Sequence, residues 1–139
     1  MKERIIITGY SGSLARRTTE LLKDNYEIIG LTSNKKRVNN KNIYYWNTST
    51  DEIDERALEN CKHIIHLSGY PILKRWTNKS KILMQQSRIG AANLLFNKCK
   101  KLNISPVTCI SASAIGIYGL NAKGIKSEND EIGTDWIAR

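Results

Sequence analysis

The sequence predicts an α/β protein built on a doubly wound parallel sheet. Short apolar runs that suit buried strands alternate along the chain with segments of helical periodicity. This alternation is typical of parallel strands that are joined by right-handed crossovers. A glycine-containing turn, Gly9–Gly12, separates the first strand from the first helix. We therefore expect about five strands in the order 3-2-1-4-5, within one domain that spans residues 1–139.

The strands are expected where apolar residues run together. Arg4–Thr8 reads RIIIT, the continuous apolar run of a strand that is buried on both faces. Similar runs predict four further strands, at Tyr26–Thr32, Asn42–Trp46, His63–Leu67 and Val107–Ser111. The polar, basic residues 33–41 are expected to form a loop between the second and third strands.

Helices are expected from the spacing of apolar residues. One face of a first helix, which runs to about Asp24, carries Leu14, Thr18, Leu21 and Leu22. A longer helix is predicted at Thr77–Lys101, with Thr77 as its N-cap and an apolar face formed by Ile82, Ile89, Ala92, Phe96 and Cys99. The acidic residues 51–60 predict one or two helical turns, and Asp135–Arg139 predicts the start of another helix.

Length, composition and charge exclude several classes of protein. A chain of 139 residues with 40% apolar and 25% charged residues fits one globular domain. No apolar run approaches the roughly 18 residues of a membrane span, and the start is too short for a signal peptide, so we expect a cytoplasmic protein. The three cysteines lack metal-ligand spacing, which favours reduced, structural roles and no metal site; they are Cys61, Cys99 and Cys109.

The turn after the first strand carries the candidate chemistry. In the segment Thr8–Ala15, which reads TGYSGSLA, Gly9 allows a tight turn and Gly12 lets the backbone approach a pyrophosphate. The N–H groups that open the following helix favour an anion. We interpret this loop as a dinucleotide-binding site; a purely structural turn is the alternative.

The end of the second strand bears on the choice of nicotinamide cofactor. An NAD-preferring site usually has Asp or Glu there, whereas this chain has Thr32 and Ser33 followed by Asn34 and the cations Lys35–Arg37. Hydroxyls and cations suit a 2′-phosphate, so NADP is favoured and NAD is the second choice. The alternative is that Lys35–Arg37 is only a solvated loop.

Charge is distributed unevenly along the chain. The formal net charge is +9, and residues 60–127 contain eleven Lys or Arg and no acidic residue. Such a field attracts an anionic ligand, although most of these cations are expected to lie on the outward face of the long helix. This basic stretch has no base-stacking pattern of closely spaced aromatic residues, so nucleic-acid binding is not expected.

Several motifs together resemble one known family. TGYSGSLA is followed, in order, by HLSGYPI at His66–Ile72, KRWT at Lys74–Thr77, SRI at Ser87–Ile89 and SASAIGIYG at Ser111–Gly119. The set resembles the NAD-dependent epimerase/dehydratase family, an atypical branch of the short-chain dehydrogenases/reductases with a Rossmann-type fold. The resemblance covers essentially the whole chain.

The resemblance implies roles for particular residues. The pyrophosphate would be held by Gly9, Tyr10, Ser11, Gly12, Ser13 and Leu14. Thr32 and Ser33 would meet the adenosine ribose or its phosphate, and the cofactor would pass beside Leu67, Ser68 and Gly69. Arg88 would point toward the cofactor from the long helix. Ser113 would supply a hydroxyl near the nicotinamide, as a candidate catalytic residue; a strand-end serine and a surface arginine are the alternatives for these two.

The chain also departs from the family pattern. Ser33 stands where Arg is common, and His66 and Ser68 replace the Asn and Ala of an NLAG segment, with His66 expected to be a satisfied strand-end histidine. The family's Tyr-x-x-x-Lys proton relay would follow Ser113 by about 25 residues, which reaches the end of this sequence. Tyr118 is too early and has Ala122 where the lysine would stand. We therefore expect a cofactor-binding part, truncated before the substrate region.

Three functions remain open. The first is the NADP(H)-binding portion of an epimerase- or reductase-like oxidoreductase, with an unknown small-molecule substrate and no turnover by this chain alone. The second is a non-catalytic protein that senses the nucleotide, and the third is a remnant without a ligand. Because the fifth strand would be an unpaired edge, self-association is also expected.

Overall fold

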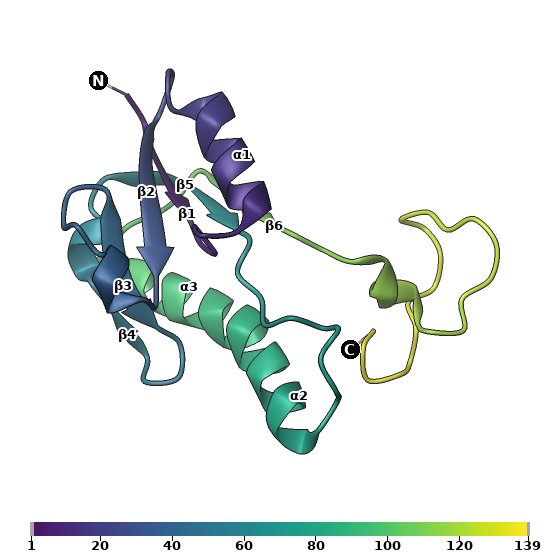
Figure 1. Cartoon of the computed structure of the whole chain (residues 1–139). Helices are drawn as coiled ribbons and strands as arrows, with labels where there is room; N and C mark the ends of the chain where they lie inside the picture. The colour runs from purple at the N-terminus through teal and green to yellow at the C-terminus, as the bar shows by residue number, and fades with distance from the viewer. Residues whose placement is uncertain (1, 139) are drawn as a thin grey trace.

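The structure, a computed structural model that describes residues 2–138, has the α/β fold that the sequence predicts. Its parallel strands are β1 (Arg4–Ile7), β2 (Glu27–Thr32), β3 (Ile43–Asn47), β5 (Cys61–His66) and β6 (Thr108–Ser111). They lie in the order β3-β2-β1-β5-β6, which confirms the predicted order 3-2-1-4-5 (Figure 1).

The predicted number of strands was wrong by one. A short sixth strand, β4 (Glu52–Ile53), pairs antiparallel with β3 and extends the sheet at that edge. The sequence had predicted only helical turns for residues 51–60, and a single 3₁₀ turn, Glu55–Ala57, is present. Asp51 has φ +52°, and the chain reverses direction here to form a hairpin. A strand of only two residues has no periodic pattern by which the sequence could predict it.

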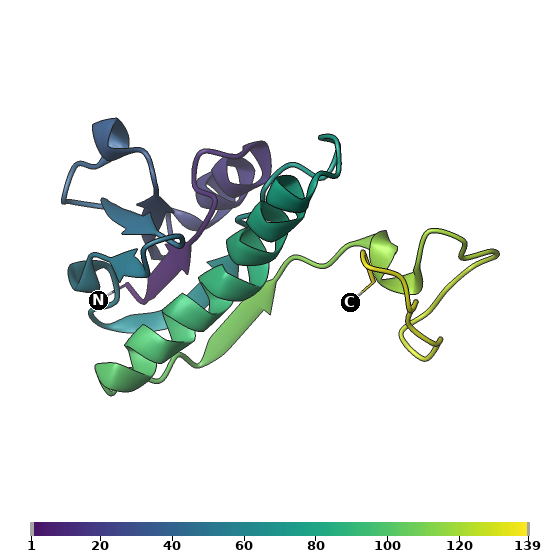
Figure 2. The same ribbon diagram turned by 90° about the horizontal axis from the view of Figure 1, so that it is seen from below.

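Helices cover both faces of the sheet. Helix α1 (Ser13–Leu22) lies on one face. On the other face, α2 (Asn78–Gln85), a π-helical turn (Gln86–Gly90) and α3 (Ala91–Lys101) form one continuous rod, which Figure 2 shows crossing the sheet. Thr77 caps this rod as predicted, since its hydroxyl accepts from the Ser80 N–H at 3.1 Å. Within residues 2–138, no helix has the length and apolar character needed to cross a membrane.

The core has two layers because successive residues of a strand point to opposite faces. Ile6 of β1 belongs to the larger layer, which is completed by the neighbouring strands and by Ala91, Leu94, Leu95 and Cys99 of α3. Ile5 and Ile7 belong to the smaller layer, where Ala15 of α1 packs against the sheet. The small side chain of Ala15 allows α1 to lie close to β1.

The predicted apolar helix faces were partly wrong. In α1, Leu14 and Leu21 are 59% and 65% exposed, and Ala15 is the buried residue. In the long rod, Cys99 is buried as expected, but three of the predicted contacts are about half exposed: Ile82, Ile89 and Phe96. Both helices carry apolar residues on more than one face, so periodicity alone could not decide which face meets the sheet.

Residues 112–138 extend away from the sheet in both views (Figures 1 and 2). They contain one 3₁₀ turn, Ile115–Tyr118, and otherwise irregular chain. The helix expected at Asp135–Arg139 is not formed by the described residues; a turn is present at 136–138, in which the Asp135 carboxylate accepts from the N–H groups of Ile137 and Ala138. Arg139 lies outside the described residues.

We expect the protein to self-associate through β6. Among the described residues β6 pairs only with β5, and its neighbourhood exposes Val107 at 74% and Ile110 at 55%. An exposed apolar edge strand can pair with another copy, whereas a charge on such an edge opposes pairing. Light scattering should therefore show a mass that rises with concentration, and Ile110→Lys should reduce that rise. The matched variant Ile125→Lys, on a fully exposed loop residue, should not. A monomer at high concentration would contradict this expectation.

Candidate functional site

The glycine turn that follows β1 packs directly against the loop that follows β5. Gly9 has φ +64°, a left-handed conformation that favours glycine. A Cβ at this position would lie 2.9 Å from the carbonyl carbon and oxygen of Leu67. The turn closes through the Gly12 N–H, which donates to the Gly9 carbonyl at 2.8 Å. Gly9 is therefore required both by its backbone conformation and by the close approach of the second loop.

The N-terminus of α1 opens beside this turn. Gly12 precedes the helix in an extended conformation, and the first turn contains no acidic side chain. The Arg16 N–H makes the first bond of the helix, to the Gly12 carbonyl. The earlier N–H groups have no partner within a helix, and their partial positive charge attracts anions. Ser11 and Ser13 are exposed beside them, so a phosphate group can be bound here.

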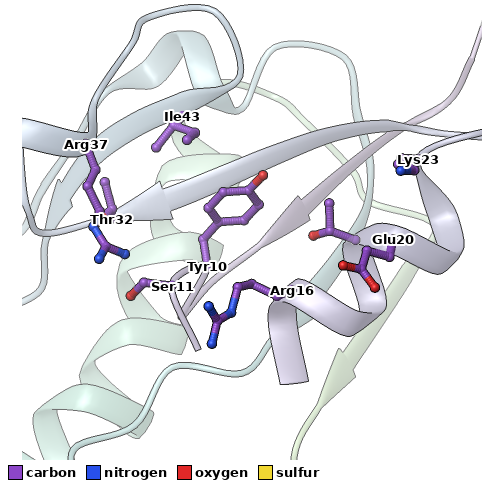
Figure 3. Close-up of a pocket in the computed structure, with 9 residues that line it drawn as sticks. Tyr10, Ser11, Arg16, Glu20, Lys23, Thr32, Arg37 and Ile43 are labelled. Atoms are coloured by element: carbon purple, nitrogen blue, oxygen red, sulfur yellow. The ribbon is translucent and has the colours of Figure 1, made fainter. Parts of the chain in front are cut away.

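Tyr10 occupies a place that the sequence did not predict. Its ring covers Gly30 of β2, where a Cβ would lie 2.4 Å from the ring carbon Cγ. The tyrosine thus packs on the sheet beside α1, over a part of β2 that is followed only by a 3₁₀ turn, Lys35–Arg37, rather than a helix. The backbone of Tyr10 is part of the glycine turn, whereas its side chain forms the floor of an adjoining groove (Figure 3).

That groove has a volume of about 530 Å³ and is lined by cations at the end nearest the glycine turn. Figure 3 shows the guanidinium groups of Arg16 and Arg37 on either side of Ser11, with Thr32 close to Arg37. Thr32 is buried, and its hydroxyl accepts from the Asn34 N–H at 3.2 Å. Ser33, the other residue predicted here, is exposed and does not line the groove. Arg16 was missed because it lies inside a helix, where a cation gives no signal of its own.

A second cavity, of about 580 Å³, lies at the other side of the carboxyl edge of the sheet. It brings together predicted residues from three elements: the end of β5, the long helical rod and the segment after β6. They are Leu67, Ser68, Gly69, Arg88 and Ser113. The described residues contain no cluster of His, Cys, Asp or Glu that could hold a metal ion.

One buried hydroxyl links β1 to the loop after β5. Thr8 Oγ1 accepts from the backbone N–H groups of Leu67 and Ser68, both at 3.0 Å, and lies 2.8 Å from Nδ1 of His66. Since the hydroxyl oxygen already accepts two bonds, its own proton goes to Nδ1 of the histidine. This assigns the neutral tautomer that carries its proton on Nε2. The sequence signal for Thr8 was only its place before Gly9.

His66 is therefore only half satisfied, contrary to the expectation of a fully bonded strand-end histidine. The residue is 6% exposed, and its Nε2 has no hydrogen-bond partner among the described residues. Burial lowers the pKa of His66 below its usual 6.5; the Arg88 carbonyl opposes this shift and the Arg88 charge adds to it. The imidazole is thus held neutral as an acceptor for Thr8. His63, by contrast, bonds to Glu3 at 3.1 Å and packs edge-on against Tyr26, as a structural residue would.

Arg88 lies against the loop after β5. Its guanidinium packs on Gly69, where a Cβ would lie 2.9 Å from Nη2, and Nη1 donates to the carbonyls of Tyr70 and Met84 at 3.3 Å. The sequence offered two alternatives for Arg88, a cofactor-directed side chain and a surface cation. In the structure its guanidinium is bonded to backbone carbonyls at the edge of the cavity. The neighbouring Ser87, part of the SRI motif but given no role by the sequence, also contacts this loop: its hydroxyl accepts from the Tyr70 N–H at 2.7 Å.

The segment after β6 supplies the outer wall of the second cavity. Ser113 is exposed there, and Trp136 stacks edge-on with Trp76 at 5.5 Å between ring centroids. The hydroxyl of Tyr118 donates to the Ser127 carbonyl at 2.9 Å, so it is engaged within its own loop. The cysteines are all free, and burial raises the pKa of Cys61 to about 12, which leaves this thiol protonated.

The doubly wound sheet and the glycine turn at a helix N-terminus place the chain among the nucleotide-binding type of α/β folds. The model of the NAD dependent epimerase/dehydratase family matches residues 5–135, and the chain belongs to this family. The epimerase family protein YfhF of Bacillus subtilis is 32% identical over 128 residues, which are 90% of this chain and 42% of that relative. The chain therefore spans less than half of the length of this relative.

Solved structures agree in fold. The nucleoside-diphosphate sugar epimerase of Corynebacterium glutamicum superposes with a TM-score of 0.78 at 24% identity, covering 99% of this chain and 28% of that one. The human epimerase family protein SDR39U1, solved with NADPH, gives a TM-score of 0.74 at 17% identity, covering 96% and 44%. The family resemblance and the Rossmann-type fold that the motifs predicted are thus confirmed.

We expect His66 to make stability depend on pH. Because its pKa is lowered in the folded state, the unfolded chain takes up a proton more readily, and the free energy of unfolding falls as the pH drops below about 6.5. His66→Asn removes the titrating group but keeps a side-chain oxygen that can accept from Thr8. Urea unfolding at pH 7, 6 and 5 should show a smaller loss of stability in this variant. If the wild type and His66→Asn lose the same free energy of unfolding between pH 7 and pH 5, His66 is not the group responsible.

Proposed function

We propose that this chain is the NADP(H)-binding portion of an epimerase- or reductase-like oxidoreductase, acting on a small-molecule substrate that further residues would recognise. The observation that carries the proposal is the cationic end of the groove beside the glycine turn. There Arg16, Arg37 and Ser11 surround a space next to Thr32, at the end of β2. In doubly wound folds this is where the adenosine ribose is recognised.

The charges around this space favour a 2′-phosphate over a ribose hydroxyl. No carboxylate follows β2 before residue 51, whereas an NAD-preferring site usually has one there. The one acidic residue that lines the groove, Glu20, pairs with Arg17 at 3.4 Å. Two guanidinium groups can each donate two parallel bonds to phosphate oxygens, which makes arginine well suited to this ligand. That NADPH was found with SDR39U1 agrees with this proposal.

The rest of the cofactor would follow the carboxyl edge of the sheet. Its pyrophosphate would meet the turn Gly9–Gly12 and the N–H groups of Ser13 and Leu14. A dinucleotide in this orientation would then pass Leu67–Gly69 and bring its nicotinamide, which supplies hydride chemistry when bound, toward the cavity lined by Ser113. The two glycines fit such a ligand because side chains there would fill the space against neighbouring backbone: a Cβ at Gly12 would lie 3.1 Å from the Gly9 carbonyl oxygen.

The chemistry of this chain alone would be incomplete. Ser113 offers a hydroxyl that can orient a carbonyl or alcohol oxygen, but it needs a proton donor with a suitable pKa beside it. Tyr118, the nearest tyrosine in the sequence, donates to Ser127 instead. We therefore propose binding without turnover. NADPH oxidation by this chain with a small carbonyl compound or a nucleotide sugar would contradict that part of the proposal.

Nucleotide titration tests the proposal directly. Tryptophan fluorescence of the purified chain should show saturable binding of NADPH, and binding of NADH should be about tenfold weaker, which corresponds to about 1.4 kcal/mol. Arg16→Met with Arg37→Met should remove this preference by weakening NADPH and leaving NADH unchanged. Lys36→Met is the matched control, since Lys36 lies in the same 3₁₀ turn as Arg37 but does not line the groove.

Each result has a clear meaning. Equal affinities for the two nucleotides in the wild type would refute the NADP preference while leaving dinucleotide binding intact. A folded chain that binds neither nucleotide would show that the glycines make only a structural turn.

A further inference from the structure

The π-helical turn Gln86–Gly90 interrupts the long rod at the point where it passes the loop after β5. Directly after it, the Ala91 N–H bonds to the carbonyls of Arg88 and of Gln86, five residues back, rather than to that of Ser87, its partner in a regular α-helix. Turns of this kind are rare and are frequently found at functional sites. An unusual turn whose side chains contact a candidate ligand loop calls for a functional explanation.

Ser87 bonds to the loop through both its side chain and its backbone. Its Oγ accepts from the Tyr70 N–H at 2.7 Å and donates to the Met84 carbonyl at 3.0 Å. Its carbonyl accepts from Ser68 Oγ at 3.2 Å. One residue of the turn thus holds the loop at two positions, Ser68 and Tyr70.

Arg88 completes the attachment. Nη1 donates to the Tyr70 carbonyl, and the guanidinium is so close to Gly69 that an added Cβ would lie 2.9 Å from Nη2 and 3.0 Å from Cζ. On its other side the same loop is held by Thr8, which accepts from the N–H groups of Leu67 and Ser68. The backbone of Leu67–Tyr70 is therefore fixed between β1 and the π-helical turn.

We propose that the π-helical turn is a positioning device, in which Ser87 and Arg88 hold the loop Leu67–Tyr70 in the conformation that accepts the dinucleotide. The inference rests on the proposed function, because the loop is expected to lie beside the cofactor. Both positioning residues act through the loop. A regular α-helix would bring the two side chains to the loop with different spacing, so the additional residue in this turn has a role beyond helix stability.

Three variants and one control separate this role from a general contribution to folding. Ser87→Ala removes the acceptor of the Tyr70 N–H, and Ser87→Thr keeps it. Deletion of Gln86, an exposed residue, restores regular α-helical spacing in the rod. Ser105→Ala is the matched control, because Ser105 is an exposed serine in the loop before β6.

The first measurement is amide hydrogen exchange without nucleotide, followed by NMR. In Ser87→Ala the Tyr70 amide should exchange at least tenfold faster, whereas amides of α3 should keep their wild-type rates. The second measurement is NADPH titration. Ser87→Ala and the Gln86 deletion should weaken binding by at least fivefold, Ser87→Thr should restore most of the affinity, and Ser105→Ala should match the wild type.

The outcomes distinguish this inference from the proposed function. If Ser87→Ala and the deletion variant bind NADPH with the same affinity as the wild type, the inference is overturned and the proposed function is not. A wild type that binds no dinucleotide would refute the proposed function and the inference with it. If the deletion variant does not fold, the NADPH affinities of Ser87→Ala and Ser87→Thr test the inference: equal affinities in the two variants would overturn it.

Discussion

The site depends on one buried hydroxyl group, that of Thr8. By accepting two backbone N–H groups from Leu67 and Ser68, it fixes the loop after β5 against the strand that begins the glycine turn. A buried N–H without a partner costs about 1–3 kcal/mol, so removal of this hydroxyl would destabilise the contact between the glycine turn and the loop after β5. His66 completes the arrangement, because only a neutral imidazole can accept the remaining proton of Thr8 at 2.8 Å. Burial lowers the pKa of His66, which keeps the imidazole neutral and so preserves its bond to Thr8.

The position of Gly9 follows from the same constraint. Gly9 has a left-handed conformation and packs so closely on the Leu67 backbone that an added Cβ would lie only 2.9 Å from it. The loop after β5 is in turn held from the opposite side by Ser87 and Arg88. Backbone contacts, rather than flexible side chains, thus set the shape of the carboxyl edge, which suits the recognition of a ligand by N–H groups and helix dipoles.

Much of the fold was predictable because it depends on local pattern. The run Arg4–Thr8 and the turn Gly9–Gly12 specify a buried strand and a helix start, and chirality then fixes the strand order. Strand β4 was missed because two residues carry no periodic signal, and the wrong helix face was chosen because the rod is apolar on two sides. For the site, the glycines and the residues at strand ends were placed correctly at the carboxyl edge, while their roles toward a ligand stay predictions. Arg16 was missed because a cation within a helix gives no signal of its own. Ser87 appeared only within the SRI motif, without a role, because its contacts are made across the fold.

The distribution of charge links the two cavities. Arg16 and Arg37 line the end of one groove, whereas Arg88 in the other cavity is already engaged with the Tyr70 and Met84 carbonyls. A guanidinium that is bonded to backbone carbonyls gives the loop rigidity and offers less to an anion, while one that lines an open groove can donate its full fork to a phosphate. Arginine thus stands in two different settings at this sheet: it lines an open groove beside α1, and it bonds to the backbone of a loop beside the π-helical turn.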